Sequence, residues 1–172
     1  MGILERAHKR DGVNGRAPMI LCTECYIQQG GKTLMLYRNK KANDINQGKW
    51  IGIGGKFEPG ESPEQCLLRE VREEVGVVLT EFCLRGVITF VMLDGSSEPI
   101  YLFLYTAGAF EGEIGSCDEG TLEWIDTDRI GELDLWEGDR LFWAWLREGK
   151  GFFSARFEYE GDRLLRHQVS FY

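Results

Sequence analysis

The stretch GGKFEPGESPEQCLLREVREEVGV, residues 54–77, carries most of the information in this chain. Ser62 followed by Pro63 is typical of the first positions of a helix, because serine caps a free backbone N–H and proline needs no donor there. Gly76 is typical of a helix end. The stretch therefore predicts a helix over residues 62–75, preceded by a glycine-rich loop.

Three acidic side chains share one side of this predicted helix. At about 100° per residue, Glu70, Glu73 and Glu74 fall within one arc of about 100°. A separate apolar face is formed by Leu68, Val71 and Val75. Like charges at this spacing repel, and near the helix C-terminus they also oppose the dipole. Because hard cations bind several carboxylate oxygens at one point, we predict a Mg²⁺ or Mn²⁺ site on the acidic face.

The loop before the helix is rich in glycine, with Gly52, Gly54, Gly55 and Gly60. Such a loop can supply a carbonyl ligand from Gly54 and N–H groups that face phosphate. It is not a Walker A loop, because Lys56 is followed by phenylalanine rather than serine or threonine. It is not a dinucleotide-binding fingerprint either, because the third glycine is missing.

The spacing of Gly55, Glu61 and the run Arg69–Val77 resembles a complete Nudix box. Further segments resemble the MutT-type 8-oxo-dGTP diphosphatases, especially a bacterial branch, at residues 48–50, 117–120, 136–139 and 152–172. The resemblance covers residues 19–172. It implies an α/β fold, an α/β/α sandwich with a mixed sheet. It also implies Mg²⁺-dependent hydrolysis of a nucleoside triphosphate, such as 8-oxo-dGTP, to the monophosphate and pyrophosphate, in the sanitation of the nucleotide pool.

The resemblance also implies roles for individual residues. The expected metal ligands are Glu70, Glu73, Glu74, Glu119 and the carbonyl of Gly54. Arg69 is expected to form an ion pair with Glu61 that braces the helix against its loop. The general base remains open between Glu70, the first choice, and Glu119.

For the base, the resemblance implies a pocket between the first strands and a second helix. Its expected lining is Thr23, Arg38, Ile53, Trp136 and Asp139, with Gly54, Gly55 and Lys56 facing the phosphates. Trp136 would stack on a purine, and Asp139 would hydrogen-bond its edge. Four alternatives stay open: Trp136 as ordinary core, Asp139 as a helix cap, Arg38 as a surface strand residue, and Glu119 as part of a plain acidic turn.

Two departures from the animal enzymes bear on the base. Ile51 stands where those enzymes carry an asparagine that contacts the base, and Gly138 replaces the first of two adjacent aspartates. Base recognition therefore cannot be copied from that branch. Two other functions remain in view: hydrolysis of another nucleoside diphosphate-linked compound, such as a nucleotide sugar, and a nucleotide sensor without turnover.

The remainder of the chain reads as short alternating elements. A polar loop is expected at residues 40–49 and a second amphipathic helix at 137–147. Strands are expected at 19–29, 33–38, 77–93, 100–107, 122–125, 152–159 and 164–171. The last two strands form a predicted closing hairpin.

Composition bounds the partners. The chain has 172 residues, 43% of them apolar, and a net charge of −8, which argues against nucleic-acid polymers and membrane surfaces. A polyanionic substrate would need a divalent cation between itself and this acidic chain, and the resemblance implies a small-molecule nucleotide as that substrate. Residues 19–172 are expected to form one domain, a monomer or weak dimer, and residues 1–18 a mobile arm. Five cysteines, an odd number without dense spacing, predict free thiols and a cytoplasmic location. Cys22 and Cys25 should point to opposite faces of their strand.

Overall fold

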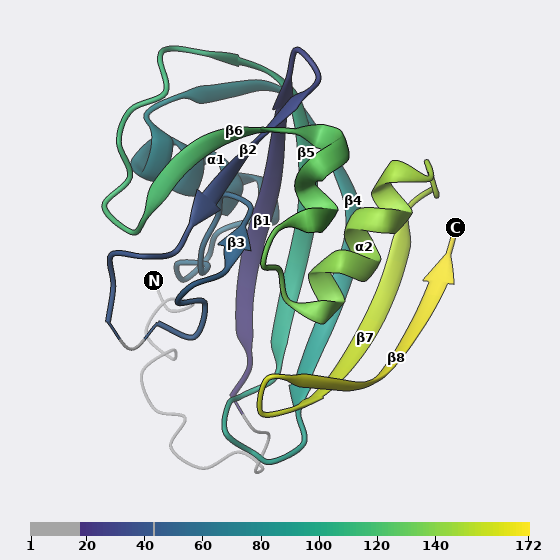
Figure 1. Cartoon of the computed structure of the whole chain (residues 1–172). Helices are drawn as coiled ribbons and strands as arrows, with labels where there is room; N and C mark the ends of the chain where they lie inside the picture. Colours follow the sequence, from purple (N-terminus) through teal and green to yellow (C-terminus); the bar gives the residue numbers. More distant parts are fainter. Residues whose placement is uncertain (1–17, 43) are drawn as a thin grey trace, which may run out of the picture.

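The computed structural model describes residues 18–42 and 44–172 (Figure 1). The predicted mobile arm, residues 1–18, lies outside the described residues apart from Pro18, so its boundary with the domain stays a prediction. The helical elements are α1 (Pro63–Val75), the 3-10 helix η1 (Thr127–Glu132) and α2 (Glu137–Arg147). The strands are β1 (Ile20–Gln29), β2 (Lys32–Tyr37), β3 (Trp50–Ile51), β4 (Val78–Met92), β5 (Ile100–Glu111), β6 (Thr121–Asp126), β7 (Phe153–Glu160) and β8 (Arg163–Phe171).

The strands form one eight-stranded mixed sheet. Its order is β3-β2-β1-β5-β4-β7-β8, and β6 pairs with β2 off this path. The pairs β1–β5 and β4–β7 are parallel, while the other pairs are antiparallel. This arrangement confirms the predicted α/β class and the predicted closing hairpin, β7–β8.

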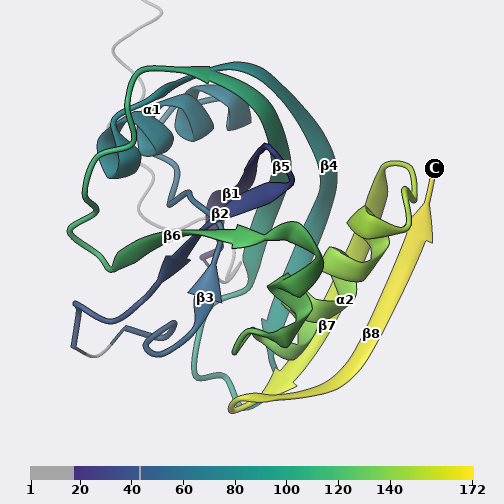
Figure 2. The ribbon, with the colours of Figure 1, turned by 45° about the horizontal axis from the view of Figure 1, so that its top comes forward.

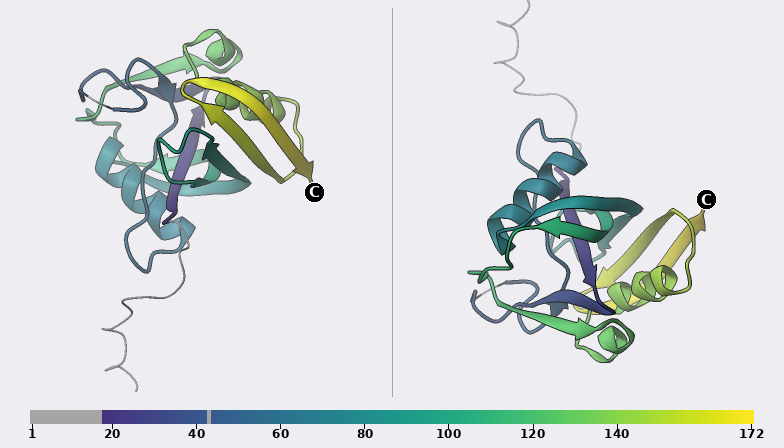
Figure 3. Two further views of the ribbon diagram at one scale, coloured as in Figure 1. Left: turned by 90° about the horizontal axis from the view of Figure 1, so that it is seen from below. Right: turned by 90° about the horizontal axis from the view of Figure 1, so that it is seen from above.

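The two α-helices cover opposite faces of the sheet (Figure 2). Successive side chains of a strand point to opposite faces, and β1 follows this rule: Cys25 and Ile27 lie in the core beneath α1, whereas Tyr26 lies in the core beneath α2. The hairpin β7–β8 lies along α2, away from α1, in both views of Figure 3. The predicted α/β/α sandwich is therefore confirmed.

The ends of α1 are where the sequence predicts them. Ser62 Oγ accepts a hydrogen bond from the backbone N–H of Gln65 at 3.2 Å, and the Gln65 side chain accepts one from Ser62 N at 2.9 Å. Gly76 adopts the left-handed conformation, with φ 80°, and its N–H bonds to the carbonyl of Arg72. Val71 and Val75 are buried, which confirms the predicted apolar face.

The cysteines also follow the prediction. All five lie within the described residues and all are free thiols. Cys22 packs against the core beneath α2 and Cys25 lies in the core beneath α1, so they point to opposite faces of β1. Among the described residues, no helix is long and apolar enough to cross a membrane.

The parallel contact between β4 and β7 joins the closing hairpin to the rest of the sheet. Gly86 of β4 pairs with Phe153 of β7, next to a register shift in β4. A Cβ atom at Gly86 would lie 2.7 Å from the Phe153 ring and 2.8 Å from its carbonyl oxygen. The ring and carbonyl group of Phe153 therefore leave no room for a side chain at position 86.

We predict that Gly86→Ala destabilises the protein by about 1–3 kcal/mol, because the added methyl group must push β7 away from β4. Gly131→Ala is the matched control, since a Cβ there meets nothing within 4 Å and should change stability by less than about 0.5 kcal/mol. Urea unfolding followed by circular dichroism measures both. Equal stability of the two variants would contradict the tight β4–β7 contact.

Candidate active site

The glycine-rich loop lies along β1 as an irregular antiparallel partner. Cys25 and Ile53 exchange backbone hydrogen bonds of 2.7 and 2.9 Å, and Thr23 N donates to the Gly55 carbonyl at 2.9 Å. Further along, Phe57 N donates to Leu21 O at 3.0 Å. The loop is therefore held at fixed register beside the sheet. Neither this pairing nor β3 was predicted, because the loop has too few β-branched residues to suggest a strand.

Two glycines of the loop are required by close approach. A Cβ atom at Gly54 would lie 2.1 Å from the carbonyl oxygen of Thr23. A Cβ atom at Gly55 would lie 2.4 Å from the carboxyl carbon of Glu70. Glycine at these positions lets β1 approach one side of the loop and α1 the other.

Glu74 is the second glutamate of α1 that reaches the loop. Its Oε2 accepts a hydrogen bond of 3.2 Å from Gly54 N. Burial, assisted by the charge of Glu70, raises the pKa of Glu74 to about 7, although the Gly54 hydrogen bond and the charges of Arg38 and Lys41 oppose the rise. Glu74 thus binds its proton more tightly than an ordinary glutamate until another cation approaches.

Arg69 binds the carboxylates of Glu70 and Glu73 on α1. Its guanidinium donates to Glu70 at 2.7 Å and to Glu73 at 3.2 Å. It also donates to both oxygens of Glu61, at 2.7 and 3.0 Å, and these hydrogen bonds lower the pKa of Glu61 to about 2. A further bond of 3.0 Å reaches the carbonyl of Lys56, whose side chain is exposed. The predicted ion pair of Arg69 with Glu61 is present and ties α1 to the loop.

Glu119 comes from the segment between β5 and β6 and forms ion pairs with Arg38 and Lys41. Arg38 also donates to Asp44 at 2.6 Å, and only 9% of its surface is exposed. Arg38 is thus a buried residue of an ion-pair network rather than a surface strand residue. The charges of Arg38 and Lys41 also act on the pKa of Glu74, so this network lies on the same side of the molecule as the Glu74 carboxylate.

The donor set suits a hard divalent cation. Glu70 and Glu74 both lie against the loop, and no hydrogen bond from the described residues ends on the carbonyl oxygen of Gly54. Within residues 18–42 and 44–172, however, no three acidic, histidine or cysteine side chains meet in a group that could hold a metal. The physical reason is that Arg69 binds Glu70 and Glu73 while Arg38 and Lys41 bind Glu119. Glu70 and Glu74 thus reach the loop, whereas Glu119 is bound elsewhere by Arg38 and Lys41.

Trp136 and Asp139 lie at the start of α2, on the opposite face of the sheet from α1. The Trp136 indole donates to Asn46 Oδ1 at 2.9 Å, and Lys49 Nζ lies 5.3 Å from the centre of its ring. The tryptophan is partly buried and packs against the core beneath α2. The Trp136 side chain thus packs against the core, while Asn46 accepts from its indole N–H and Lys49 lies over its ring.

Asp139 is 5% exposed, and its carboxylate forms no hydrogen bond within the described part of the chain. No side chain caps α2, so Asp139 does not act as the helix cap. Burial, together with the charge of Glu24, raises the pKa of Asp139, and the charge of Lys49 opposes this. A Cβ at the neighbouring Gly138 would lie 2.7 Å from the Phe157 ring, so this position has no room for a second aspartate.

The two other predicted pocket residues lie on the α1 side of the sheet. Thr23 Oγ1 is 3.6 Å from Cys66 Sγ of α1, and Ile53 is fully buried in the core beneath α1. Glu24, which the sequence analysis missed, lies instead on the face of β1 that Cys22 and Tyr26 turn toward α2. An acidic residue inside an otherwise apolar strand was the signal that could have identified it.

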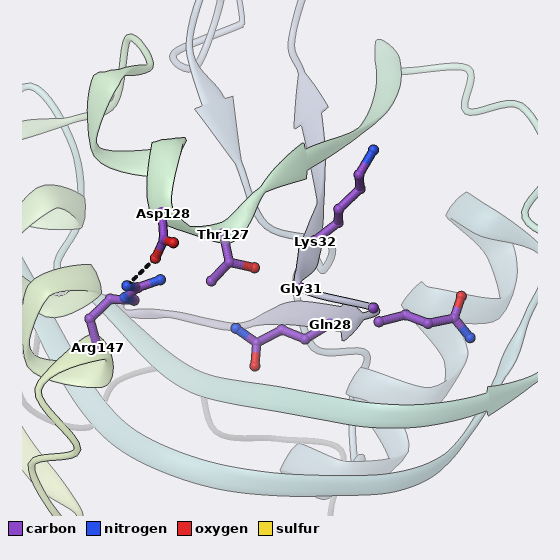
Figure 4. Close-up of a pocket in the computed structure, with 8 residues that line it drawn as sticks. Gln28, Gly31, Lys32, Thr127, Asp128 and Arg147 are labelled. Carbon is purple, nitrogen blue, oxygen red and sulfur yellow. Dashed lines mark hydrogen bonds and ion pairs between the residues drawn. The ribbon is translucent and has the colours of Figure 1, made fainter.

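A separate surface hollow of about 400 Å³ lies at the turn between β1 and β2. Figure 4 shows Gln28, Gly31 and Lys32 on one side of it and Thr127 on the other, with the Arg147–Asp128 ion pair at its edge. No residue that the sequence predicted for the site lines this hollow.

The geometry at the loop and α1 can now be compared with known proteins. The sequence of residues 22–146 matches the family model of the NUDIX domain. The chain belongs to the Nudix family. An uncharacterised Nudix hydrolase of Bacillus subtilis, YvcI, is 31% identical over 151 residues, which span 86% of this chain and 92% of that protein.

Other similarities place the chain among the MutT-like Nudix hydrolases. An oxidized purine nucleoside triphosphate hydrolase of Danio rerio is 31% identical over 150 residues, or 87% of this chain and 93% of that protein. The crystal structure of a MutT protein from Bacillus halodurans has a TM-score of 0.78 at 28% identity, covering 88% of this chain and 97% of that one. The Nudix fold predicted from the sequence is therefore confirmed.

The raised pKa of Glu74 predicts how the stability of this Nudix domain depends on pH without metal. The folded protein holds the Glu74 proton more tightly than the unfolded chain, with a pKa of about 7 against 4.5. This contribution to stability is complete below pH 4.5 and is lost as the pH rises through about 7. Between these limits, wild type should lose about 2–3 kcal/mol more than Glu74→Gln, which cannot titrate. Urea unfolding in EDTA at several pH values measures this, and parallel curves would refute it.

Proposed function

We propose that the protein is a Mg²⁺-dependent nucleoside triphosphate pyrophosphohydrolase acting on oxidised purine nucleotides such as 8-oxo-dGTP. The observation that carries the proposal is the approach of Glu70 and Glu74 to Gly55 and Gly54, beside an ion-pair network that includes Glu119. Glutamates gathered at a bare backbone loop suit a metal-bound polyphosphate better than any apolar ligand. Mn²⁺ is the expected substitute.

Glu70, Glu73, Glu74, Glu119 and the Gly54 carbonyl would hold the cation in this proposal. A bound Mg²⁺ would neutralise phosphate charge and lower the pKa of a coordinated water. Arg38 and Lys41 now bind Glu119, and they are the cations at the site best placed to bind phosphate oxygens in exchange. Arg69 keeps α1 fixed against the loop, so we assign it a positioning role.

The reaction is hydrolysis at an inner phosphorus. A water oxygen forms the new bond to phosphorus, the bridging P–O bond breaks, and pyrophosphate leaves. The water proton passes to a general base, for which Glu70 is the first choice and Glu119 the second. Both carboxylates are bound by cationic side chains, Glu70 by Arg69 and Glu119 by Arg38 and Lys41, and Glu70 also lies against the backbone of Gly55.

The base of the nucleotide would lie at the start of α2, with Trp136 against its face and Asp139 at its edge. The names of two relatives favour a purine: the Danio rerio protein is an oxidized purine nucleoside triphosphate hydrolase, and an 8-oxo-dGTP diphosphatase of Proteus vulgaris is 35% identical over 79 residues. The buried Asp139 carboxylate gives this end of the site a hydrogen-bonding group that an apolar slot lacks.

Glu74→Gln should lower kcat for Mg²⁺-dependent pyrophosphate release by about 100-fold or more, because the amide is a neutral and weaker metal ligand. Its fold should stay intact, since an amide oxygen can still accept the Gly54 hydrogen bond. Glu111→Gln, at the exposed end of β5, is the control and should keep wild-type turnover. Unchanged kcat in Glu74→Gln would remove our assignment of the metal site.

A substrate panel tests the choice of nucleotide. With Mg²⁺, we expect a higher kcat/KM for 8-oxo-dGTP than for dGTP, and pyrophosphate as the product. Release of two monophosphates from a nucleotide sugar, with little triphosphate hydrolysis, would favour the diphosphate-linked alternative. Binding of nucleotides without any turnover would favour a sensor.

A further inference from the structure

Three polar side chains on the α2 side of β1 have no part in the phosphate chemistry. Glu24 and Tyr26 are two residues apart on β1, so they share the face that α2 covers, and Asp139 comes from the first turn of α2. All three lie on the α2 side of β1, whereas the glutamates of α1 lie on the other side. Polar groups in such a position usually have partners, because an unsatisfied buried group destabilises the fold.

Glu24 is held in one orientation by the loop. Its Oε1 accepts a hydrogen bond of 2.7 Å from Gly52 N, and a Cβ atom at Gly52 would lie 2.7 Å from Glu24 Cγ. The side chain is partly exposed. One oxygen of the carboxylate thus accepts from Gly52, and no hydrogen bond from the described residues reaches the other.

Tyr26 and Asp139 lack the partners that buried polar groups normally have. The Tyr26 hydroxyl is fully buried and, among the described residues, has no hydrogen-bond partner. The charges of Glu24 and Asp139 both act on it and, after burial, raise the pKa of the Tyr26 phenol. Asp139 as a residue is 5% exposed, and its carboxylate accepts no hydrogen bond from the described part of the chain. Glu24, Tyr26 and Asp139 thus lie near one another between β1 and α2.

We propose that Glu24 is a specificity-determining residue, which binds the base together with Asp139 and selects an edge with two adjacent N–H donors, as in guanine and 8-oxoguanine. This inference rests on the proposed function. The guanine ring presents N1–H and the 2-amino group side by side, and two carboxylates on facing elements present acceptors to both. Adenine has one donor and one acceptor on the corresponding edge, so it matches this pair less well.

The test is equilibrium binding of product-like nucleotides, which needs no turnover. Isothermal titration calorimetry in EDTA compares dGMP with dIMP, which lacks only the 2-amino group. We expect wild type to bind dGMP at least about tenfold more tightly, because loss of a hydrogen bond to a charged group has this size. In Glu24→Gln the amide oxygen can keep the Gly52 hydrogen bond while its NH₂ group replaces the free acceptor. That variant should bind dGMP at least about tenfold more weakly and dIMP almost unchanged.

Glu123→Gln, on an exposed position of β6, is the matched control and should keep the preference for dGMP. Equal affinity of wild type for dGMP and dIMP, or no binding of either at millimolar concentration, overturns the proposal without any variant. A wild-type preference that survives in Glu24→Gln also overturns it. Pyrophosphate release by the same wild-type preparation reports separately on the proposed function. The proposed function can fail while the Glu24-dependent preference for dGMP is observed. Conversely, pyrophosphate can be released while that preference is absent.

Discussion

The geometry of the candidate active site depends on close contacts of Gly54 and Gly55 that leave no space for a Cβ atom at either position. The loop at Gly54 and Gly55 is pressed between β1 and α1, with Thr23 O on one side and the Glu70 carboxylate on the other. Backbone hydrogen bonds to β1 fix the register of the loop, and the Arg69–Glu61 pair fixes α1 against it. Glutamates that would repel one another on an isolated helix are therefore brought to one backbone segment.

The second constraint is charge balance. The acidic side chains at the loop do not remain as bare charges, because Arg69, Arg38 and Lys41 bind three of them. Within the described residues Glu74 forms no such ion pair, and burial raises its pKa to about 7. A ligand that combines a divalent cation with phosphate could replace these internal pairs with matched external ones, carboxylate to metal and guanidinium to phosphate.

The sequence predicts the local elements well and the facing of side chains less well. The capping residues of α1, the apolar face with Val71 and Val75, and the closing hairpin follow from patterns within a few residues. The pairing of the glycine loop with β1 does not, because glycine carries no β-strand signal and long-range hydrogen bonds decide its position. The same limit explains the prediction for Thr23. The sequence can assign a pocket to a strand, but the face on which each side chain lies depends on the register of the strand. In the structure Glu24, rather than Thr23, lies on the side of α2.

Strand β1 links the two ends of the site in a rigid way. One of its faces contacts the loop and α1, while the other carries Glu24 and Tyr26 toward α2. The separation between the group that would recognise a base and the group that would cleave a phosphate chain is thus a property of one extended segment, set by the fixed rise per residue. Evolution can change the base by exchanging single residues on one face without moving the other. Insertion of one residue into β1 would exchange the two faces and disconnect recognition from cleavage in a single step.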